Sequence, residues 1–182
     1  MPGDDVLNPA DVVMDRGFTV PGTPAEVWPW IAQLGKGRGR WYLVRGIERF
    51  LPPRGRGLRH IDPRWQHLDV GDVIPDYGRD ETFTVVSVDA PHELVYSSVR
   101  GRLLVTWAIT LTPGGQRELP STRRDETGAG TRTRVRLRLR FQGVRRRWLV
   151  RSAGELIDLV TIAGMAAGLS ERMRDEHRRG GC

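Results

Sequence analysis

Residues 131–141 alternate strictly between arginine and apolar or hydroxyl side chains. One face of this segment carries Arg132, Arg134, Arg136, Arg138 and Arg140, and the other carries Thr133, Val135, Leu137, Leu139 and Phe141. A repeat of two residues is typical of a strand that buries one face and exposes the other to water. The pattern therefore predicts a half-buried antiparallel strand with a row of arginines on its outer face.

Five other segments have the composition of strands, because they are rich in β-branched and aromatic residues and are bounded by turn signals. They are residues 12–20, 72–75, 82–89, 94–99 and 103–112. Within the last of these, one face is apolar and consists of Leu103, Val105, Trp107, Ile109 and Leu111. The chain therefore predicts a mostly antiparallel sheet of six to seven strands.

Two short helices are expected after the first strand. Residues 23–26 (TPAE) place threonine at the cap, proline at the first helical position and glutamate at the third, which is a helix start signal. This helix should end at Gly35 and kink near Ala25, because Pro29 lies inside the helix and removes a hydrogen bond. The second helix is expected over residues 42–50.

Four stretches show neither the helical nor the strand period. Residues 51–68 are rich in proline and arginine and predict a long irregular loop. Residues 113–130 have almost no apolar side chain and predict a mobile hairpin loop. Residues 1–10 and 179–182 are expected to be mobile tails. We expect the whole chain to form a single domain.

The C-terminal part predicts one long helix, from Ser152 to about Arg178, that closes over the sheet. Ser152 and Glu155 have the spacing of a capping box. The apolar arc of this helix spans about half of its circumference and consists of Leu156, Leu159, Val160, Ile162, Ala163, Ala166, Ala167, Leu169 and Met173. The opposite half carries Asp158, Thr161, Gly164, Gly168, Glu171 and Arg172. Gly164 and Gly168 mark a flank where we expect another backbone or a ligand to approach closely.

Composition narrows the classes of function. The 182 residues suffice for one domain with a sizeable core. The single cysteine, Cys182, excludes a disulfide framework and a cysteine-based metal site. Residues 1–15 lack the basic and apolar regions of a signal peptide, so we expect a cytoplasmic protein. The apolar run of the last helix is shorter than the ~20 residues that a membrane span needs. The net charge of +7 predicts attraction to polyanions, acidic proteins or anionic surfaces.

The order of the elements is one strand, two helices, a run of antiparallel strands and a long C-terminal helix. This order resembles the helix-grip fold, which is shared by START-like lipid-transfer domains, plant allergen-type proteins and polyketide cyclases of the SRPBCC superfamily. Residues 27–42 (VWPWIAQLGKGRGRWY) and 60–75 (HIDPRWQHLDVGDVIP) resemble a bacterial branch labelled polyketide cyclase/dehydrase-like. The chain departs from that pattern at Arg40, where a small residue is expected, and in the basic segment 145–150.

The resemblance implies an α+β fold in which a curved antiparallel sheet wraps around the C-terminal helix. Between them it implies a cavity for an apolar or aromatic small molecule, with no invariant catalytic residues. The candidate cavity residues are Arg38, Trp41, Tyr42, His60, Trp65, Tyr96, Trp107, Leu159, Ala163 and Ala166. Their indole and phenol groups would orient a ligand, and Arg38 and His60 at the mouth would bind a carboxylate or polarise a carbonyl. Trp30 and Tyr77 are further aromatic candidates, and core packing is the alternative interpretation, above all for Trp28 and Trp107.

Metal and nucleotide chemistry fit the sequence less well. Residues 60–72 contain two histidines and three aspartates, which offer nitrogen and oxygen ligands. Turn formation explains the aspartates, so we predict no metal site and no cofactor. The glycines of residues 35–39 follow a helix rather than a strand and lack the spacing of a phosphate-binding loop, so they predict a helix end and a turn.

Three functions are compatible with the sequence. The first is binding or transfer of a hydrophobic small molecule without turnover. The second is an enzyme of the cyclase/dehydratase type, a lyase, in which Arg38, Tyr42, His60 or Tyr96 acts as acid or base on a polyketone. The third is binding of an acidic carrier protein or an anionic surface through the arginine strand, with Trp148-Leu149-Val150 as the apolar part. Because that face has few aromatic side chains for base stacking, nucleic acid is disfavoured.

Overall fold

The computed structural model describes residues 1–76, 81–114, 131–144 and 147–180, and for residues 147–161 and 180 it describes the backbone alone. The elements, in chain order, are β1 (Val12–Pro21), α1 (Pro24–Ala32), α2 (Arg45–Glu48), the 3-10 turns η1 (Pro53–Gly55) and η2 (Pro63–Trp65), β2 (Val73–Pro75), β3 (Thr82–Asp89), β4 (Glu93–Arg100), β5 (Leu103–Gly114), β6 (Arg132–Gln142) and α3 (Arg147–Gly180). Tyr77 lies outside the described residues, as do residues 115–130 of the predicted hairpin loop.

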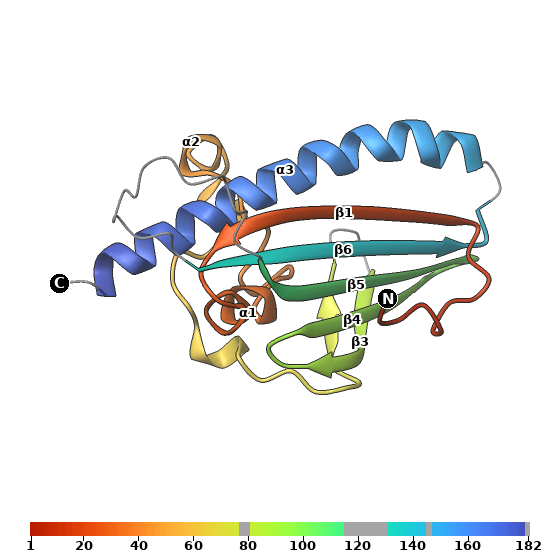
Figure 1. Cartoon of the computed structure of the whole chain (residues 1–182). Helices are drawn as coiled ribbons and strands as arrows, with labels where there is room; N and C mark the ends of the chain where they lie inside the picture. The colour runs from red at the N-terminus through yellow and green to blue at the C-terminus, as the bar shows by residue number, and fades with distance from the viewer. Residues whose placement is uncertain (77–80, 115–130, 145–146, 181–182) are drawn as a thin grey trace, which may run out of the picture.

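The six strands form one antiparallel sheet in the order β1-β6-β5-β4-β3-β2. Each strand predicted from the sequence is present, with bounds that differ by at most two residues. In Figure 1 the long helix α3 runs along β1 and passes α2 in its C-terminal half, while α1 lies at the same end of the molecule. One hydrophobic core lies between the inner face of the sheet, α1 and the C-terminal half of α3.

The alternation predicted for the last strand is confirmed in the first half of β6, over residues 132–137, whereas residues 138–142 are all half-buried. Val135 and Leu137 are buried in the core, whereas Arg132, Arg134 and Arg136 are exposed. β6 pairs with β1 on one side and with β5 on the other, so this strand lies inside the sheet and not at its edge. The fully buried inner positions of β6 are Thr133, Val135 and Leu137, in the first half of the strand.

The first ten residues pack against the outer face of the sheet. Asp4 forms ion pairs with Arg138 (Oδ2–Nη1, 2.7 Å) and Arg140 (Oδ1–Nη1, 3.0 Å) of β6. Arg138 also pairs with Asp15 of β1 (Nε–Oδ1, 2.6 Å). Two of the five arginines of the strand are therefore neutralised within the chain. These contacts disfavour the mobile tail expected for residues 1–10. The mobility of this segment stays a prediction.

Helix α1 begins as the sequence predicts. The Glu26 amide donates to the Thr23 hydroxyl (3.3 Å), and the Thr23 amide donates to the Glu26 carboxylate (2.6 Å), which completes a capping box. Helix α2 is shorter than the predicted segment 42–50, because the Leu43 carbonyl accepts a hydrogen bond from Arg172 of α3 instead of from its own helix (2.9 Å). The prolines at positions 52 and 53 disfavour helical backbone beyond α2.

Helix α3 begins at Arg147, before the predicted start at Ser152. The expected cap at Ser152 is therefore wrong, because that residue lies inside the helix. The spacing of a capping box is a local signal, and residues 147–151 contain no glycine or proline that would stop a helix from forming earlier. The C-terminal end agrees with the prediction within two residues, which is the ordinary uncertainty of a helix boundary.

The buried face of α3 differs from the predicted apolar arc. Ile162, Met165, Leu169 and Met173 are in the core, but Ala163 and Ala167 are exposed. Gly168 and Arg172, which were placed on the polar half, are buried. Alanine is compatible with either environment, and a buried arginine gives no apolar signal, so the hydrophobic pattern misplaced the arc.

The predicted close approach at the glycine pair is confirmed. A Cβ on Gly168 would lie 2.6 Å from the carbonyl carbon and oxygen of Tyr42, and one on Gly164 would lie 2.8 Å from the Leu43 side chain. The segment before α2 therefore lies directly on this flank of α3. The same chain makes both approaches, with backbone at Gly168 and with a side chain at Gly164.

Candidate functional site

A cavity of about 250 Å³ lies between the sheet and the segment that follows α1. Its walls come from the end of α1 and the following turn, from β2 and from the inner face of β3, β4 and β5. The lining residues are Leu34, Gly35, Trp41, Ile74, Pro75, Asp76, Phe83, Tyr96 and Trp107. Among the residues of α3 whose side chains the structure describes, 162–179, none lines it. The position between the sheet and that helix, which the resemblance implies, stays a prediction for the part of α3 that precedes them. Hollows of about 410 Å³ and 310 Å³ elsewhere are lined mostly by polar or charged residues.

Strand register gathers four aromatic rings in the cavity wall. Tyr96 on β4 is paired with Trp107 on β5, and their rings stack with centroids 5.7 Å apart. Phe83 on β3 lies 5.8 Å from Tyr96 and 6.0 Å from Trp107. Trp41 reaches the same group from the other wall, 6.0 Å from Trp107. Aromatic pairs at such distances add to the stability that burial provides, so the four rings form a well-packed apolar wall.

Gly35 forms part of the wall because no larger residue fits there. Its φ is +130°, and a Cβ at this position would lie 2.5 Å from Cγ2 of Ile74. The backbone of Gly35 bridges to that of Arg40, which closes the turn predicted from the glycine spacing. This turn places Trp41 over the cavity.

Two buried polar atoms beside the cavity have no hydrogen-bond partner among the described residues, namely Tyr96 Oη and Arg38 Nε. Burial raises the pKa of Tyr96, so its hydroxyl keeps its proton. Burial lowers the pKa of Arg38, which nevertheless remains a cation, because arginine does not lose its charge in proteins. Asp76, the acidic residue of the wall, is engaged in an ion pair with Arg100.

Arg38 is held in place by contacts on its outer nitrogen and its plane. Its Nη2 donates to the carbonyls of Ala32 (3.0 Å) and Trp65 (3.1 Å). Its guanidinium lies over the Trp65 ring, 5.0 Å from the centroid, and Arg64 lies over the same ring at 5.6 Å. Trp65 therefore positions Arg38 and is not itself part of the cavity lining.

Gln33, which the sequence analysis did not select, fixes the loop that carries Trp65. Its side chain is fully buried, donates to the His60 carbonyl (3.2 Å) and accepts from the Asp62 amide (3.0 Å). The Arg64 side chain binds the Asp62 carboxylate and holds the pKa of that carboxyl at about 2. The sequence offered one signal for this role, a glutamine at the end of an amphipathic helix. If such a glutamine is buried, its amide needs hydrogen-bond partners from a neighbouring segment.

The other sequence candidates whose side chains the structure describes are not part of the cavity lining. Tyr42 is fully buried, but its hydroxyl donates to the Trp30 carbonyl (2.8 Å). His60 and Ala163 are exposed, and Ala166 is half-buried on α3 without lining the cavity. The side chain of Leu159 and the segment Trp148-Leu149-Val150 lie outside what the structure describes. Trp30 is a core residue whose Nε1 donates to Glu176 (2.9 Å).

Several wall residues were missed by the sequence analysis. Leu34, Ile74 and Phe83 have no polar group to attract attention, and their place in the wall depends on how α1, β2 and β3 meet. Phe83 was detectable as an inward position of its strand, because it alternates with Thr82 and Thr84. No pattern in the sequence predicts that β2 lies against the turn at Gly35.

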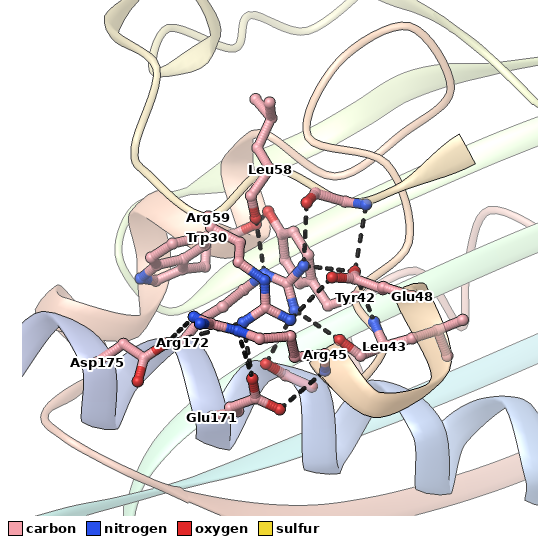
Figure 2. Close-up of polar contacts among 12 residues, drawn as sticks. Trp30, Tyr42, Leu43, Arg45, Glu48, Leu58, Arg59, Glu171, Arg172 and Asp175 are labelled. Carbon is pink, nitrogen blue, oxygen red and sulfur yellow. Dashed lines mark hydrogen bonds and ion pairs between the residues drawn. The ribbon is translucent and has the colours of Figure 1, made fainter. Parts of the chain in front are cut away.

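Figure 2 shows a second buried polar region, on the flank of α3. Arg172 Nε donates to the Leu58 carbonyl (2.7 Å), and Nη1 donates to the Leu43 carbonyl (2.9 Å) and to Gly168 (3.1 Å). Its Nη2 donates to Glu48 Oε1 (2.6 Å) and to the Gly57 carbonyl (3.2 Å). All five N–H groups of a fully buried guanidinium are therefore satisfied.

Glu48 is the counter-ion in this region, which we name the arginine lock (Arg172, Glu48 and the groups bonded to them). Its Oε2 accepts from Arg59 Nη2 (2.8 Å), and Arg59 Nη1 continues to Glu171 (2.8 Å). The guanidinium of Arg172 also lies 4.6 Å from the centroid of the Tyr42 ring. The lock fastens α3 to the segment between Tyr42 and Arg59.

Two further properties bear on function. Among the described residues no three His, Cys, Asp or Glu side chains are grouped closely enough to hold a metal ion. In the same part of the chain, no helix has the length and the run of apolar residues that crossing a membrane requires.

No family model matches the chain, and no curated protein does. Solved structures do match. XoxI from Bacillus cereus has a TM-score of 0.50 at 14% identity, over 91% of this chain and 98% of that one. Norcoclaurine synthase from Thalictrum flavum, solved with dopamine and hydroxybenzaldehyde, has a TM-score of 0.48 at 12% identity, over 90% of this chain and 87% of that one. MLL2253 from Mesorhizobium loti has a TM-score of 0.47 at 18% identity, over 88% of this chain and 98% of that one.

At these identities the similarity is one of fold. The chain has the α+β helix-grip fold that the sequence analysis predicted, with six antiparallel strands and a long C-terminal helix. The ligand and any reaction have to be inferred from the cavity itself.

Proposed function

We propose that the protein binds a small aromatic molecule of one or two rings in the cavity lined by Trp41, Phe83, Tyr96 and Trp107. The single observation that carries the proposal is this cavity of about 250 Å³, whose wall is almost entirely apolar and aromatic. Concave, mostly apolar pockets with few polar groups are the usual form of small-molecule sites.

The volume limits the size of the ligand. A dry apolar cavity of about 150 Å³ in another protein accommodates benzene. The present cavity is larger by roughly one more small ring and lies below the range of about 300–1,000 Å³ for drug-sized ligands. Flat, rigid molecules suit it, because they stack on indole and phenol rings at little cost in conformational entropy.

The same limits disfavour turnover of a polyketone. A long, folded chain needs more room than this cavity provides. Of the four proposed acid–base groups, Tyr96 alone lines it, and its raised pKa makes it a poor proton donor near neutral pH. Tyr42 is occupied by the Trp30 carbonyl, and His60 is exposed. Binding without chemistry accounts for the described residues with fewer assumptions.

The arginine face supports partner binding less well than its sequence indicates. Arg138 and Arg140 are occupied by Asp4 and Asp15, which leaves Arg132, Arg134 and Arg136 as the exposed arginines of β6. Three exposed cations on one strand are an ordinary solvated surface. Binding of an acidic carrier protein or an anionic surface remains the alternative, and its affinity would fall steeply with salt.

The test begins with native mass spectrometry of protein purified without added ligand, because a non-covalent mass that is lost on denaturation would identify an occupant. Calorimetric titrations with indole and naphthalene follow. We expect micromolar binding by the wild type. Phe83→Trp should weaken naphthalene binding about tenfold, because the larger ring fills the cavity. The control is Phe50→Trp, which adds the same indole at an exposed position and should leave affinity unchanged. If neither indole nor naphthalene binds, the proposal is wrong.

A further inference from the structure

We propose that the ligand is an aromatic acid, a carboxylate or phenolate whose anionic oxygen accepts hydrogen bonds from Tyr96 Oη and Arg38 Nε at one end of the cavity. This inference rests on the proposed function and specifies the polar group of the ligand. It makes Tyr96 and Arg38 the residues that determine specificity.

Tyr96 supplies the first donor. Its side chain is 2% exposed, it lines the cavity, and its hydroxyl has no partner among the described residues. A buried hydroxyl without a partner carries its full desolvation penalty, so such groups are rare unless a ligand or water satisfies them. The ring is fixed by Trp107 and Phe83, so the hydroxyl cannot turn away to solvent.

Arg38 supplies the second donor and the charge. The position where Gly35 would carry a Cβ is 3.7 Å from Arg38 Cδ, and Nε is bonded to that carbon. Gly35 is itself part of the cavity wall, so the unpartnered Nε lies close to the wall, beside Gly35 and Ile74. Arg38 and Tyr96 are also close enough to interact electrostatically. Two donors at one end of an apolar cavity call for an acceptor.

The charge balance around Arg38 favours an anion over a neutral acceptor. No carboxylate of the described residues forms an ion pair with Arg38, and its nearest acidic influence is the longer-range one of Asp72. A part-buried cation without a counter-ion is costly, and pairing it relieves that cost. Asp76, the one acidic side chain in the wall, is already compensated by Arg100, so it adds little repulsion.

The experiment compares three molecules of one shape: 2-naphthoate, 2-naphthalenemethanol and 2-methylnaphthalene. Titration calorimetry at pH 7 gives their affinities for the wild type, Tyr96→Phe and Arg38→Met. We expect the wild type to bind the acid about tenfold tighter than the hydrocarbon, because hydrogen bonds to charged groups are stronger than neutral ones. Each variant should lose about tenfold in affinity for the acid and keep its affinity for the hydrocarbon within about twofold.

A matched control for each variant is present in the chain. Arg64 lies over the same Trp65 ring as Arg38 but is solvent-exposed and paired with Asp62, so Arg64→Met should bind all three molecules as the wild type does. Tyr42→Phe removes a buried tyrosine hydroxyl away from the cavity and should likewise keep the preference for the acid. Thermal unfolding of each variant checks that it is folded.

Three outcomes would overturn the inference. If the acid and the hydrocarbon bind the wild type equally, or if neither Tyr96→Phe nor Arg38→Met weakens the acid, the polar end does not select an anion, while the proposed function stands. If the alcohol binds as tightly as the acid, a neutral acceptor suffices and the ligand is not an acid. If none of the three molecules binds, the proposed function fails and this inference fails with it.

Discussion

The two buried polar regions of this protein differ in how completely the chain satisfies them. In the arginine lock, all five N–H groups of Arg172 donate to protein oxygens and Glu48 compensates the charge. At the cavity, Tyr96 Oη and Arg38 Nε have no partner among the described residues. The chain is therefore able to saturate a buried arginine with its own groups, and it does so where no ligand is needed.

This difference separates a structural region from a binding region. Every atom of a saturated region is committed to the fold, so substitution there reduces stability. An unsaturated region carries a cost that a ligand can remove, so substitution there should alter binding more than folding. The comparison between the two regions can be tested by substitutions in each.

Glu48→Gln should have the largest effect, because it leaves the buried Arg172 without a counter-ion. Removing one partner of a buried pair costs about 3–5 kcal/mol, and we expect a loss of this size in the free energy of unfolding, measured with urea. Asp175→Asn is the control, because its pair with the exposed Arg45 is worth less than about 1 kcal/mol, and its second pair, with Arg59, is longer at 3.7 Å. Equal losses in the two variants would mean that the lock is no stronger than a surface pair.

Glu48→Gln should also change how the stability of the protein depends on pH. Burial acts to raise the pKa of Glu48, but the hydrogen bonds and charges of Arg172 and Arg59 outweigh it, so this pKa lies below its ordinary value of 4.5. A lowered folded-state pKa contributes stability above the ordinary value, and that stability is lost as the pH falls through the folded-state pKa. The wild type should therefore lose stability below pH 4.5, and Glu48→Gln should lose less over the same range.

Gly168→Ala should have an intermediate effect. The added Cβ would lie 2.6 Å from the Tyr42 backbone, and overpacking of this kind costs about 1–3 kcal/mol, more than the ~1 kcal/mol that alanine gains over glycine in a helix. Gly46→Ala, in α2, adds a Cβ with nothing within 4 Å and should be neutral or stabilising. Urea midpoints that move equally in both variants would contradict the close approach of α3 to the segment before α2.

Substitutions of the two buried tyrosines should have the smallest effects on stability, and the two effects should differ. Tyr42→Phe leaves the Trp30 carbonyl, in the last turn of α1, without its donor and should cost about 1–2 kcal/mol. Tyr96→Phe removes a hydroxyl that has no partner among the described residues and should leave the stability of the ligand-free protein unchanged or slightly higher. Thermal unfolding distinguishes the two, and an equal loss in Tyr96→Phe would show that its hydroxyl is already satisfied.

The strands were predictable from the sequence because alternation is a local property. The exposed arginines of β6 and the inward position of Trp107 followed from it. The ion pair of Arg138 with Asp15 joins residues far apart in the chain, and nothing local marks which of the arginines would be neutralised. The buried face of α3 was misplaced for a related reason, since Arg172 is buried only because Glu48 lies against it.

The candidate site was predicted in part. Trp41, Tyr96 and Trp107 were selected from the sequence, and the structure brings them to one cavity. Their meeting depends on strand register and on the turn at Gly35, which the sequence does not specify. Tyr42 and His60 were selected because aromatic and titratable residues often serve sites, yet residue type does not distinguish a tyrosine that supports the fold from one that faces a ligand.

Trp41 and Tyr42 are adjacent in the chain, yet the first lines the cavity and the second lies beneath the arginine of the lock. A ligand that restrains Trp41 therefore restrains the peptide on which α3 is docked. Thermodynamic linkage requires the converse as well, since two events that stabilise the same segment favour each other by equal free energies. Weakening the contact of α3 with this segment should thus lower ligand affinity at a distance, without any change in the cavity wall.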